Sequence, residues 1–288
     1  MSTDDSRQAF AVMDAFRDAG GQVLDTARIY GTSEEVVGRW LRTNSADVGI
    51  EIVSKGAHPS ADWSPRLSAS AVMKDLELSL ATLRVSSVHC YLLHRDDPGT
   101  PIADIARTLT SIVRVGKATS VGVSNWTPVR VAELATELRT IDGPALAVVS
   151  NYGGLALPTA PAEWPGVRSS TPELVRLAHY EDFRILGWSS LSSGYFTDSR
   201  PHLEFAGVEN QRRRSTLWRV ADEAGAAPIA VLIRALATMD TAFVPVVSTR
   251  NPGRIRSLCA AAVDHSLDDV VTRFRQALGA SRATAPKW

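Results

Sequence analysis

Four side chains that can take part in proton transfer lie where three short apolar runs of the sequence end: Asp25, Tyr30, Lys55 and His94. The runs are Val23–Asp25, Gly49–Ser54 and Val88–Leu93. An ammonium favours the phenolate form of a nearby tyrosine, and a carboxylate keeps that ammonium charged and oriented. Such a tyrosine can donate a proton to a carbonyl oxygen as hydride reaches the carbon. An imidazole beside the same oxygen can hold it by a hydrogen bond and take part in the proton transfer. The set predicts a proton-transfer site that needs no metal.

The elements that must position these side chains alternate strictly between strand and helix. Seven strands are predicted, ending at Asp25, Ser54, Leu93, Val123, Val149, Trp188 and Val247. Apolar residues at helical spacing separate them, as in the stripe Val72, Leu76, Leu80 and Leu83. This alternation predicts an α/β fold of the (β/α)8 TIM-barrel type, with residues 1–288 forming a single domain. In such a barrel the functional side chains gather at the carboxyl ends of the strands.

A closed barrel of this type has eight strands, so one strand is missing from the sequence. The missing strand should precede the first predicted helix, which carries Val12 and Phe16 on one face. Its loss leaves two strand edges unpaired, and each buried unpaired amide or carbonyl costs roughly 1–3 kcal/mol. We therefore hypothesise that another segment or another chain, as in a homo-oligomer, covers the gap. A natural protein that begins further upstream would supply the strand itself.

Composition narrows the class of protein. The chain has 288 residues, 44% of them hydrophobic, and a formal net charge of zero, so neither a nucleic acid nor a membrane is an expected partner. Cys90 and Cys259 lie in apolar runs and are expected to pack in the core, in a reducing compartment. No apolar run approaches membrane-spanning length, and the N-terminus is not that of a signal peptide. We expect a soluble, cytoplasmic protein that acts on a small molecule.

Four segments of the sequence resemble the aldo-keto reductases, in particular a bacterial branch of that family. They are Leu-Asp-Thr-Ala-Arg-Ile-Tyr-Gly, Ser-Lys-Gly-Ala-His-Pro, Leu-Leu-His-Arg-Asp-Asp-Pro and Gly-Lys-Ala-Thr-Ser-Val-Gly-Val-Ser-Asn-Trp. By this resemblance Asp25, Tyr30, Lys55 and His94 form the catalytic tetrad of an NADPH-dependent reductase of aldehydes or ketones. Compared with the family, the sequence lacks the usual N-terminal hairpin and first barrel strand.

The resemblance also implies a binding site for NADPH. The carboxamide would contact Ser124, Asn125 and Ser150, and the nicotinamide ring would stack on Trp188. The pyrophosphate would lie on Ser189, Leu191 and Ser192. The adenosine 2′-phosphate would be held by Ser248, Thr249, Arg250 and Arg254, since a guanidinium suits that anion. Outside this site, we interpret Arg212–Arg214 as a solvated helix face and His58 as a structural residue of its loop.

Two other functions are compatible with the sequence. In the first, Lys55 is the Schiff-base nucleophile of a barrel lyase, which requires a desolvated amine that Asp25 does not keep charged. In the second, the chain is a catalytically impaired or inert relative that binds NADPH or nothing and serves as an assembly partner. The missing strand favours this second alternative, and the intact set of four side chains argues against it.

Overall fold

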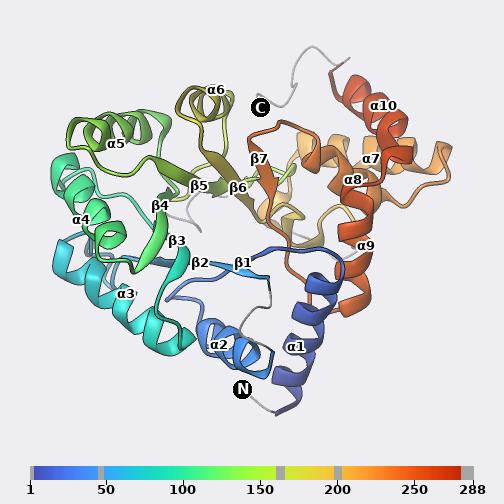
Figure 1. Cartoon of the computed structure of the whole chain (residues 1–288). Helices are drawn as coiled ribbons and strands as arrows, with labels where there is room; N and C mark the ends of the chain where they lie inside the picture. Colours follow the sequence, from blue (N-terminus) through green and yellow to red (C-terminus); the bar gives the residue numbers. More distant parts are fainter. Residues whose placement is uncertain (1–2, 45–48, 160–165, 198–202, 280–288) are drawn as a thin grey trace.

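Seven parallel strands lie side by side in chain order in one curved sheet, from β1 to β7 (Figure 1). The computed structural model describes residues 3–44, 49–159, 166–197 and 203–279. The strands are β1 Val23–Asp25, β2 Glu51–Gly56, β3 Val88–Leu93, β4 Ala118–Ser124, β5 Leu146–Tyr152, β6 Arg184–Trp188 and β7 Phe243–Pro245. The predicted α/β class and the seven strands are confirmed, and the sheet forms an incomplete barrel.

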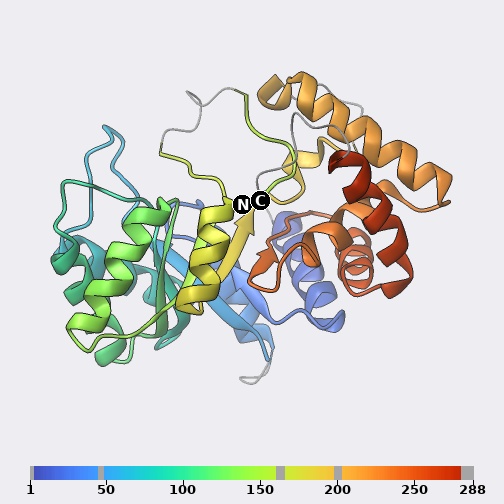
Figure 2. The same cartoon turned by 90° about the horizontal axis from the view of Figure 1, so that it is seen from above.

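Helices connect the strands and cover the outer face of the sheet (Figures 1 and 2). They are α1 Thr3–Asp18, α2 Ser33–Thr43, α3 Ala69–Leu83, α4 Ile102–Arg114, α5 Pro128–Thr140, α6 Pro172–Glu181, α7 Val208–Glu223, α8 Pro228–Ala237, α9 Pro252–Ala262 and α10 Asp268–Gly279. Short 3₁₀ turns occupy Ser192–Gly194, Leu203–Phe205 and His265–Leu267. None of the helices described here is long and apolar enough to cross a membrane.

Local sequence explains where several helices begin. The side chains of Thr127, Thr171 and Asn251 each accept a hydrogen bond from a backbone N–H in the first turn of α5, α6 and α9. In all three cases proline follows the capping residue and fixes a helical φ. These caps set the direction in which the chain leaves the strand ends, and therefore which residues lie at the rim of the barrel.

Among the described residues, the buried apolar side chains form four clusters, and two of these make up the layers on the two faces of the sheet. The larger layer lies between the sheet and its helices and contains Trp40, Leu76, Leu109 and Leu134. The smaller layer lies inside the barrel and consists of Val53, Cys90, Leu92 and Leu186, with partly buried side chains packed against it. Side chains two positions apart in a strand point to the same face. The next inward positions after Val53 and Leu92 are therefore Lys55 and His94.

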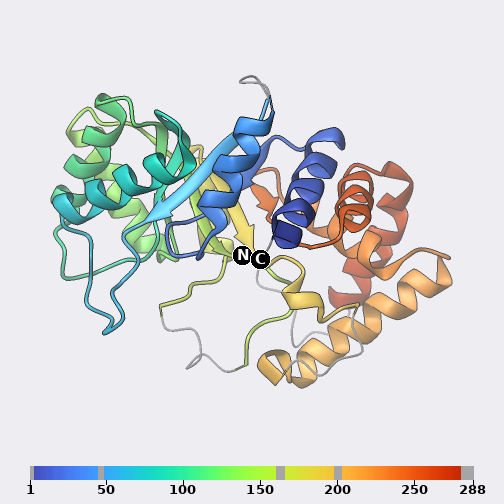
Figure 3. The same ribbon diagram turned by 90° about the horizontal axis from the view of Figure 1, so that it is seen from below.

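The sheet does not close between β7 and β1. Pairing runs from β1 to β7 without a bond between these two, and among the described residues no further strand lies between them. On the outside of the gap α1 packs against α9 (Figures 1 and 3). Between the two edge strands is an apolar cavity of about 470 Å³, lined by residues of α1, β1, β7 and α9. The hypothesis that another segment or chain covers this gap stays a prediction.

One sequence interpretation outside the site is wrong. Arg212–Arg214 was expected to form a solvated helix face, yet Arg213 is 3% exposed. Its guanidinium donates to the carbonyl oxygen of Leu155 at 2.7 Å and to the carboxylate of Glu209 at 3.1 Å. The residue faces the core because α7 packs on the segment after β5, and that contact could not be read from a run of three arginines.

Candidate active site

Backbone hydrogen bonds continue the strand pairing past the ends of β1, β2 and β3. The N–H of Arg28 donates to the carbonyl of Lys55 at 2.8 Å, which fastens the loop of Tyr30 to β2. The N–H of His94 donates to the carbonyl of Gly56 at 2.8 Å, which fastens the end of β3 to the same strand. All four predicted side chains are therefore positioned by the backbone of β2 and its two neighbours, β1 and β3.

The tightest contact of the site is between Lys55 and Asp25. The Lys55 ammonium lies 2.6 Å from both carboxylate oxygens of Asp25 and 2.9 Å from the carbonyl oxygen of Thr26. The sequence predicted that the strand ends at Ser54, just before Lys55. In the structure β2 continues to Gly56, so Lys55 lies inside the strand, and it is 1% exposed. A buried ammonium with three oxygen partners is held in one orientation.

Tyr30 and His94 face the same space from the ends of β1 and β3, on either side of β2. The Lys55 ammonium lies 5.0 Å from the centroid of the Tyr30 ring, and the rings of Tyr30 and His94 meet edge to face with centroids 5.6 Å apart. Tyr30 is 45% exposed, so its ring is open to the mouth of the barrel. Gly31 follows with φ of 57°, a turn that glycine adopts at no steric cost.

His94 is a neutral imidazole in this environment. Burial lowers its pKa to about 2, with smaller contributions from the positive charges of Lys55 and Arg95 and from His58. Its Nδ1 is buried and has no hydrogen-bond partner among the described residues. A neutral ring can offer one N–H donor at neutral pH, so His94 is suited to hold an oxygen by a hydrogen bond and not to supply a proton as imidazolium.

Two cavities meet at this point. The first, which we call the tetrad pocket, has a volume of about 340 Å³ and is lined by Ile29, Tyr30, His58, Trp63, His94, Arg95, Ser124, Asn125, Val167 and Trp188. The second, which we call the long groove, has a volume of about 990 Å³. Tyr30 and Trp188 line both, so the groove opens onto the phenol.

Most of the residues expected to bind a cofactor lie along the long groove. Its lining includes Trp188, Ser189, Leu191, Ser248, Thr249, Arg250 and Arg254. Ser189 has φ of 56° and Ser193 has φ of 54°, left-handed conformations that are uncommon for residues with a side chain and that cluster at functional sites. Ser192 is different: it is fully buried behind the groove, and its hydroxyl lies 3.3 Å from that of Tyr152.

The three remaining predicted residues lie at the ends of β4 and β5. The Ser124 hydroxyl donates to the carbonyl of Ser150 at 2.8 Å, and the backbone N–H of Asn125 donates to the same oxygen at 3.0 Å. The Asn125 side chain donates to the Ser124 hydroxyl at 2.9 Å and borders the tetrad pocket. The hydroxyl of Ser150 is buried and has no hydrogen-bond partner among the described residues, and Ser150 is not among the residues that line the tetrad pocket or the long groove.

The sequence of the chain matches a known protein family. The model of the aldo/keto reductase family matches residues 2–278. The chain belongs to this family. Members are oxidoreductases, and carbonyl reduction is the general chemistry of the related proteins.

Two relatives show how far the similarity extends. The chain is 30% identical over 197 residues to aflatoxin B1 aldehyde reductase member 2 of Rattus norvegicus, which covers 67% of this chain and 50% of that protein. It is 27% identical over 260 residues to the aryl-alcohol dehydrogenase (NADP+) of Phanerodontia chrysosporium, covering 80% of this chain and 65% of that protein. The chain therefore spans between half and two thirds of the length of these relatives.

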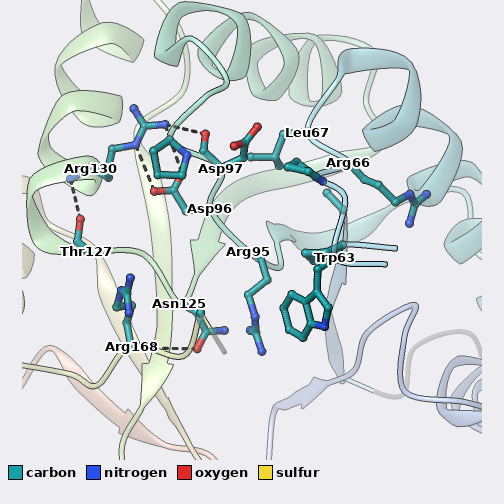
Figure 4. A pocket seen from close by; sticks show the side chains of 15 residues that line it. Trp63, Arg66, Leu67, Arg95, Asp96, Asp97, Asn125, Thr127, Arg130 and Arg168 are labelled. Atoms are coloured by element: carbon teal, nitrogen blue, oxygen red, sulfur yellow. Dashed lines mark hydrogen bonds and ion pairs between the residues drawn. The ribbon is translucent and has the colours of Figure 1, made fainter. Parts of the chain in front are cut away.

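Several residues of this aldo/keto reductase site were missed in the sequence. His58 was read as a structural loop residue, but its ring meets that of His94 edge to face at 5.0 Å and it lines the tetrad pocket. Trp63, Arg95 and Arg168 also border this region (Figure 4). Arg95 directly follows His94, which was a usable signal. Trp63 and Arg168 lie in loops that only the tertiary fold brings to the barrel mouth.

Proposed function

We propose that this aldo/keto reductase reduces an aldehyde or ketone to the alcohol with NADPH as the cofactor. The observation that carries the proposal is the grouping of Tyr30, Lys55, Asp25 and His94 at the junction of two cavities. One cavity is large enough for an extended dinucleotide and the other for a small carbonyl compound.

The residues of the long groove fit a nucleotide that carries an additional phosphate. Arg250 and Arg254 lie at the start of α9 and have no carboxylate partner among the described residues. Two uncompensated guanidinium groups beside a helix N-terminus form a site for a phosphate. Asn125, which lines the tetrad pocket, would offer its side-chain amide to the carboxamide at the other end. When bound, NADPH would supply the hydride that reduces the carbonyl carbon.

The residues of this chain would then complete the reduction. Tyr30 would donate its phenolic proton to the carbonyl oxygen, and the Lys55 ammonium would stabilise the phenolate that remains. Asp25 would keep Lys55 charged through its two hydrogen bonds of 2.6 Å. Neutral His94 would hold the carbonyl oxygen as a hydrogen-bond donor while the charge on it develops.

The proposal is tested by Tyr30→Phe. The variant should lose roughly 100-fold or more in kcat, because a general acid contributes that much, while NADPH binding survives. Binding is measured by titrating NADPH and NADH against tryptophan fluorescence, and NADPH is expected to bind more tightly. Unchanged turnover in Tyr30→Phe would refute the role of Tyr30.

The two alternatives are less well supported. A lyase needs Lys55 as a neutral nucleophile, and two carboxylate oxygens at 2.6 Å oppose that state. Trapping a substrate adduct on Lys55 with borohydride would reverse this ranking. The open edge between β7 and β1 is the one feature that favours an inert assembly partner. Failure of the chain to bind either nucleotide would support that alternative.

A further inference from the structure

The tetrad pocket continues into a third cavity that carries more positive than negative charge. This cavity, which we call the arginine pocket, has a volume of about 330 Å³ and shares Trp63, Arg95 and Asn125 with the tetrad pocket (Figure 4). Four arginines line it, together with two carboxylates: Arg66, Arg95, Arg130, Arg168, Asp96 and Asp97. Which of the arginines are neutralised decides what the pocket can bind.

Two of the four arginines are neutralised within the protein. Arg66 donates to the carboxylate of Asp75 at 2.6 Å. Arg130 donates to both carboxylate oxygens of Asp96, at 3.2 and 3.3 Å. The remaining lining carboxylate, Asp97, accepts hydrogen bonds from the Gly99 N–H and the Thr100 hydroxyl. Asp97 keeps its negative charge, but among the described residues it forms no ion pair with either of the other two arginines.

Arg95 and Arg168 lack an acidic partner among the described residues. The Arg95 Nη1 donates to the carbonyl of its neighbour His94 at 3.2 Å, and its Nε is buried without a hydrogen-bond partner. Burial lowers the pKa of Arg95, as expected for a guanidinium that lacks a counter-charge. Within the described part of the chain, the Arg168 side chain donates only to the carbonyl of Val167, at 3.3 Å.

Arg95 and Arg168 line the same cavity, and both lie beside Asn125. Figure 4 shows Arg95 extending into the pocket between Asn125 and Trp63, while Arg130 turns towards Asp96. The backbone N–H of Arg168 lies 3.5 Å from the side-chain oxygen of Asn125, so both arginines border the same residue. Arg95 follows His94 in the chain and also lines the tetrad pocket. An anion held here is therefore next to the position of the reacting carbonyl.

We propose that the arginine pocket binds a carboxylate of the substrate, so that the preferred substrate is an aldehyde or ketone that also carries an acid group. A guanidinium fork matches a carboxylate and forms two parallel charge-assisted hydrogen bonds with it. A bound carboxylate would give Arg95 a negatively charged partner and could accept from its Nε, which has no hydrogen-bond partner among the described residues. That the substrate is an aldehyde or ketone rests on the proposed function. That it carries an acid group rests on the arginine pocket alone.

The test compares 4-formylbenzoate with its neutral methyl ester, which has the same aldehyde and the same ring. In the unchanged protein kcat/KM for the acid should exceed that for the ester by about tenfold or more, since one charge-assisted pair contributes on that order. Arg95→Met and Arg168→Gln should each lower the ratio of acid to ester, mainly by raising KM for the acid. Arg176→Met, on the exposed face of α6, is the matched control and should leave the ratio unchanged.

A second readout separates this inference from the proposed reaction. 4-Methylbenzoate, which cannot be reduced, should raise the melting temperature with or without NADP+, and 4-methylbenzamide should not. Arg168→Gln changes an exposed side chain and should leave the fold intact. It therefore still tests the preference for the acid if Arg95→Met does not fold. Binding of the acid without turnover of either aldehyde would refute the proposed reduction but support the pocket. Equal kcat/KM for acid and ester, or a preference that survives both substitutions, would overturn the inference.

Discussion

The carboxyl ends of β1, β2 and β3 and the gap between β7 and β1 share one strand, yet they are built in opposite ways. At the strand ends a charged group is buried and paired, since Lys55 is 1% exposed and binds both oxygens of Asp25. At the gap apolar groups face open space, since Val23 is 39% exposed and Val244 is 42% exposed. The four side chains proposed for proton transfer are therefore positioned by β1 to β3 and do not depend on a closed sheet.

Removing the buried ammonium is the strongest test of the difference between the strand ends and the gap. Lys55→Met should lower the free energy of unfolding by about 3 kcal/mol, because Asp25 loses its partner in a largely buried position, and should lower kcat by roughly 100-fold or more. The measurements are urea unfolding and steady-state reduction of an aldehyde.

Lys117→Met is the matched control for this change. Lys117 forms an ion pair with Glu77 at 2.6 Å, in which the two side chains are 29% and 54% exposed. Its loss should cost less than about 1 kcal/mol and leave kcat unchanged. Equal losses of stability in the two variants would show that the strand ends are no better organised than the surface.

A pair of identical substitutions compares the closed part of the sheet with its open edge. Val149, in β5, is fully buried between two paired strands, whereas Val244, in β7, borders the gap. Val149→Ala should cost about 2 kcal/mol and Val244→Ala less than about 1 kcal/mol, because exposed methyl groups contribute little burial. Urea unfolding at low protein concentration measures both. A larger cost at Val244 would mean that the edge is covered in solution.

Acidification acts on the strand ends and should leave the apolar gap unaffected. The unfolded chain protonates its histidines near pH 6.5, whereas burial holds the pKa of folded His94 at about 2. The unfolded state therefore binds more protons below pH 6.5, and stability falls as the pH falls. His94 should account for about 1 kcal/mol of lost stability between pH 7 and 5.5. In His94→Gln this loss of stability between pH 7 and 5.5 should disappear. If the free energy of unfolding of the variant falls with pH as steeply as that of the unchanged protein, His94 is not its cause.

The smallest expected effect is on assembly at the gap. If another chain covers the edges of β1 and β7, light scattering should detect a species heavier than the monomer. Val244→Asp should then shift the population towards the monomer, because a charge in an apolar contact is unfavourable. A monomer at every concentration, for both proteins, would reject cover by a second copy.

Much of the fold could be predicted because each signal was local. Apolar runs followed by helical stripes predicted the seven strands that the structure contains. The interpretation of Arg213 failed because its partner Leu155 is distant in the sequence. The cofactor residues were proposed from resemblance, and the buried position of Ser192 behind the groove had no local signal.

By itself, the sequence determined which side chains end the strands, because the alternation of strand and helix places Asp25, Lys55 and His94 at the same edge. The tertiary structure alone decided which charges are compensated. Arg130 is neutralised by Asp96, whereas Arg95 beside the site has no acidic partner among the described residues. Charge pairing depends on distances of a few ångströms between loops far apart in the chain, and only the folded backbone sets those distances.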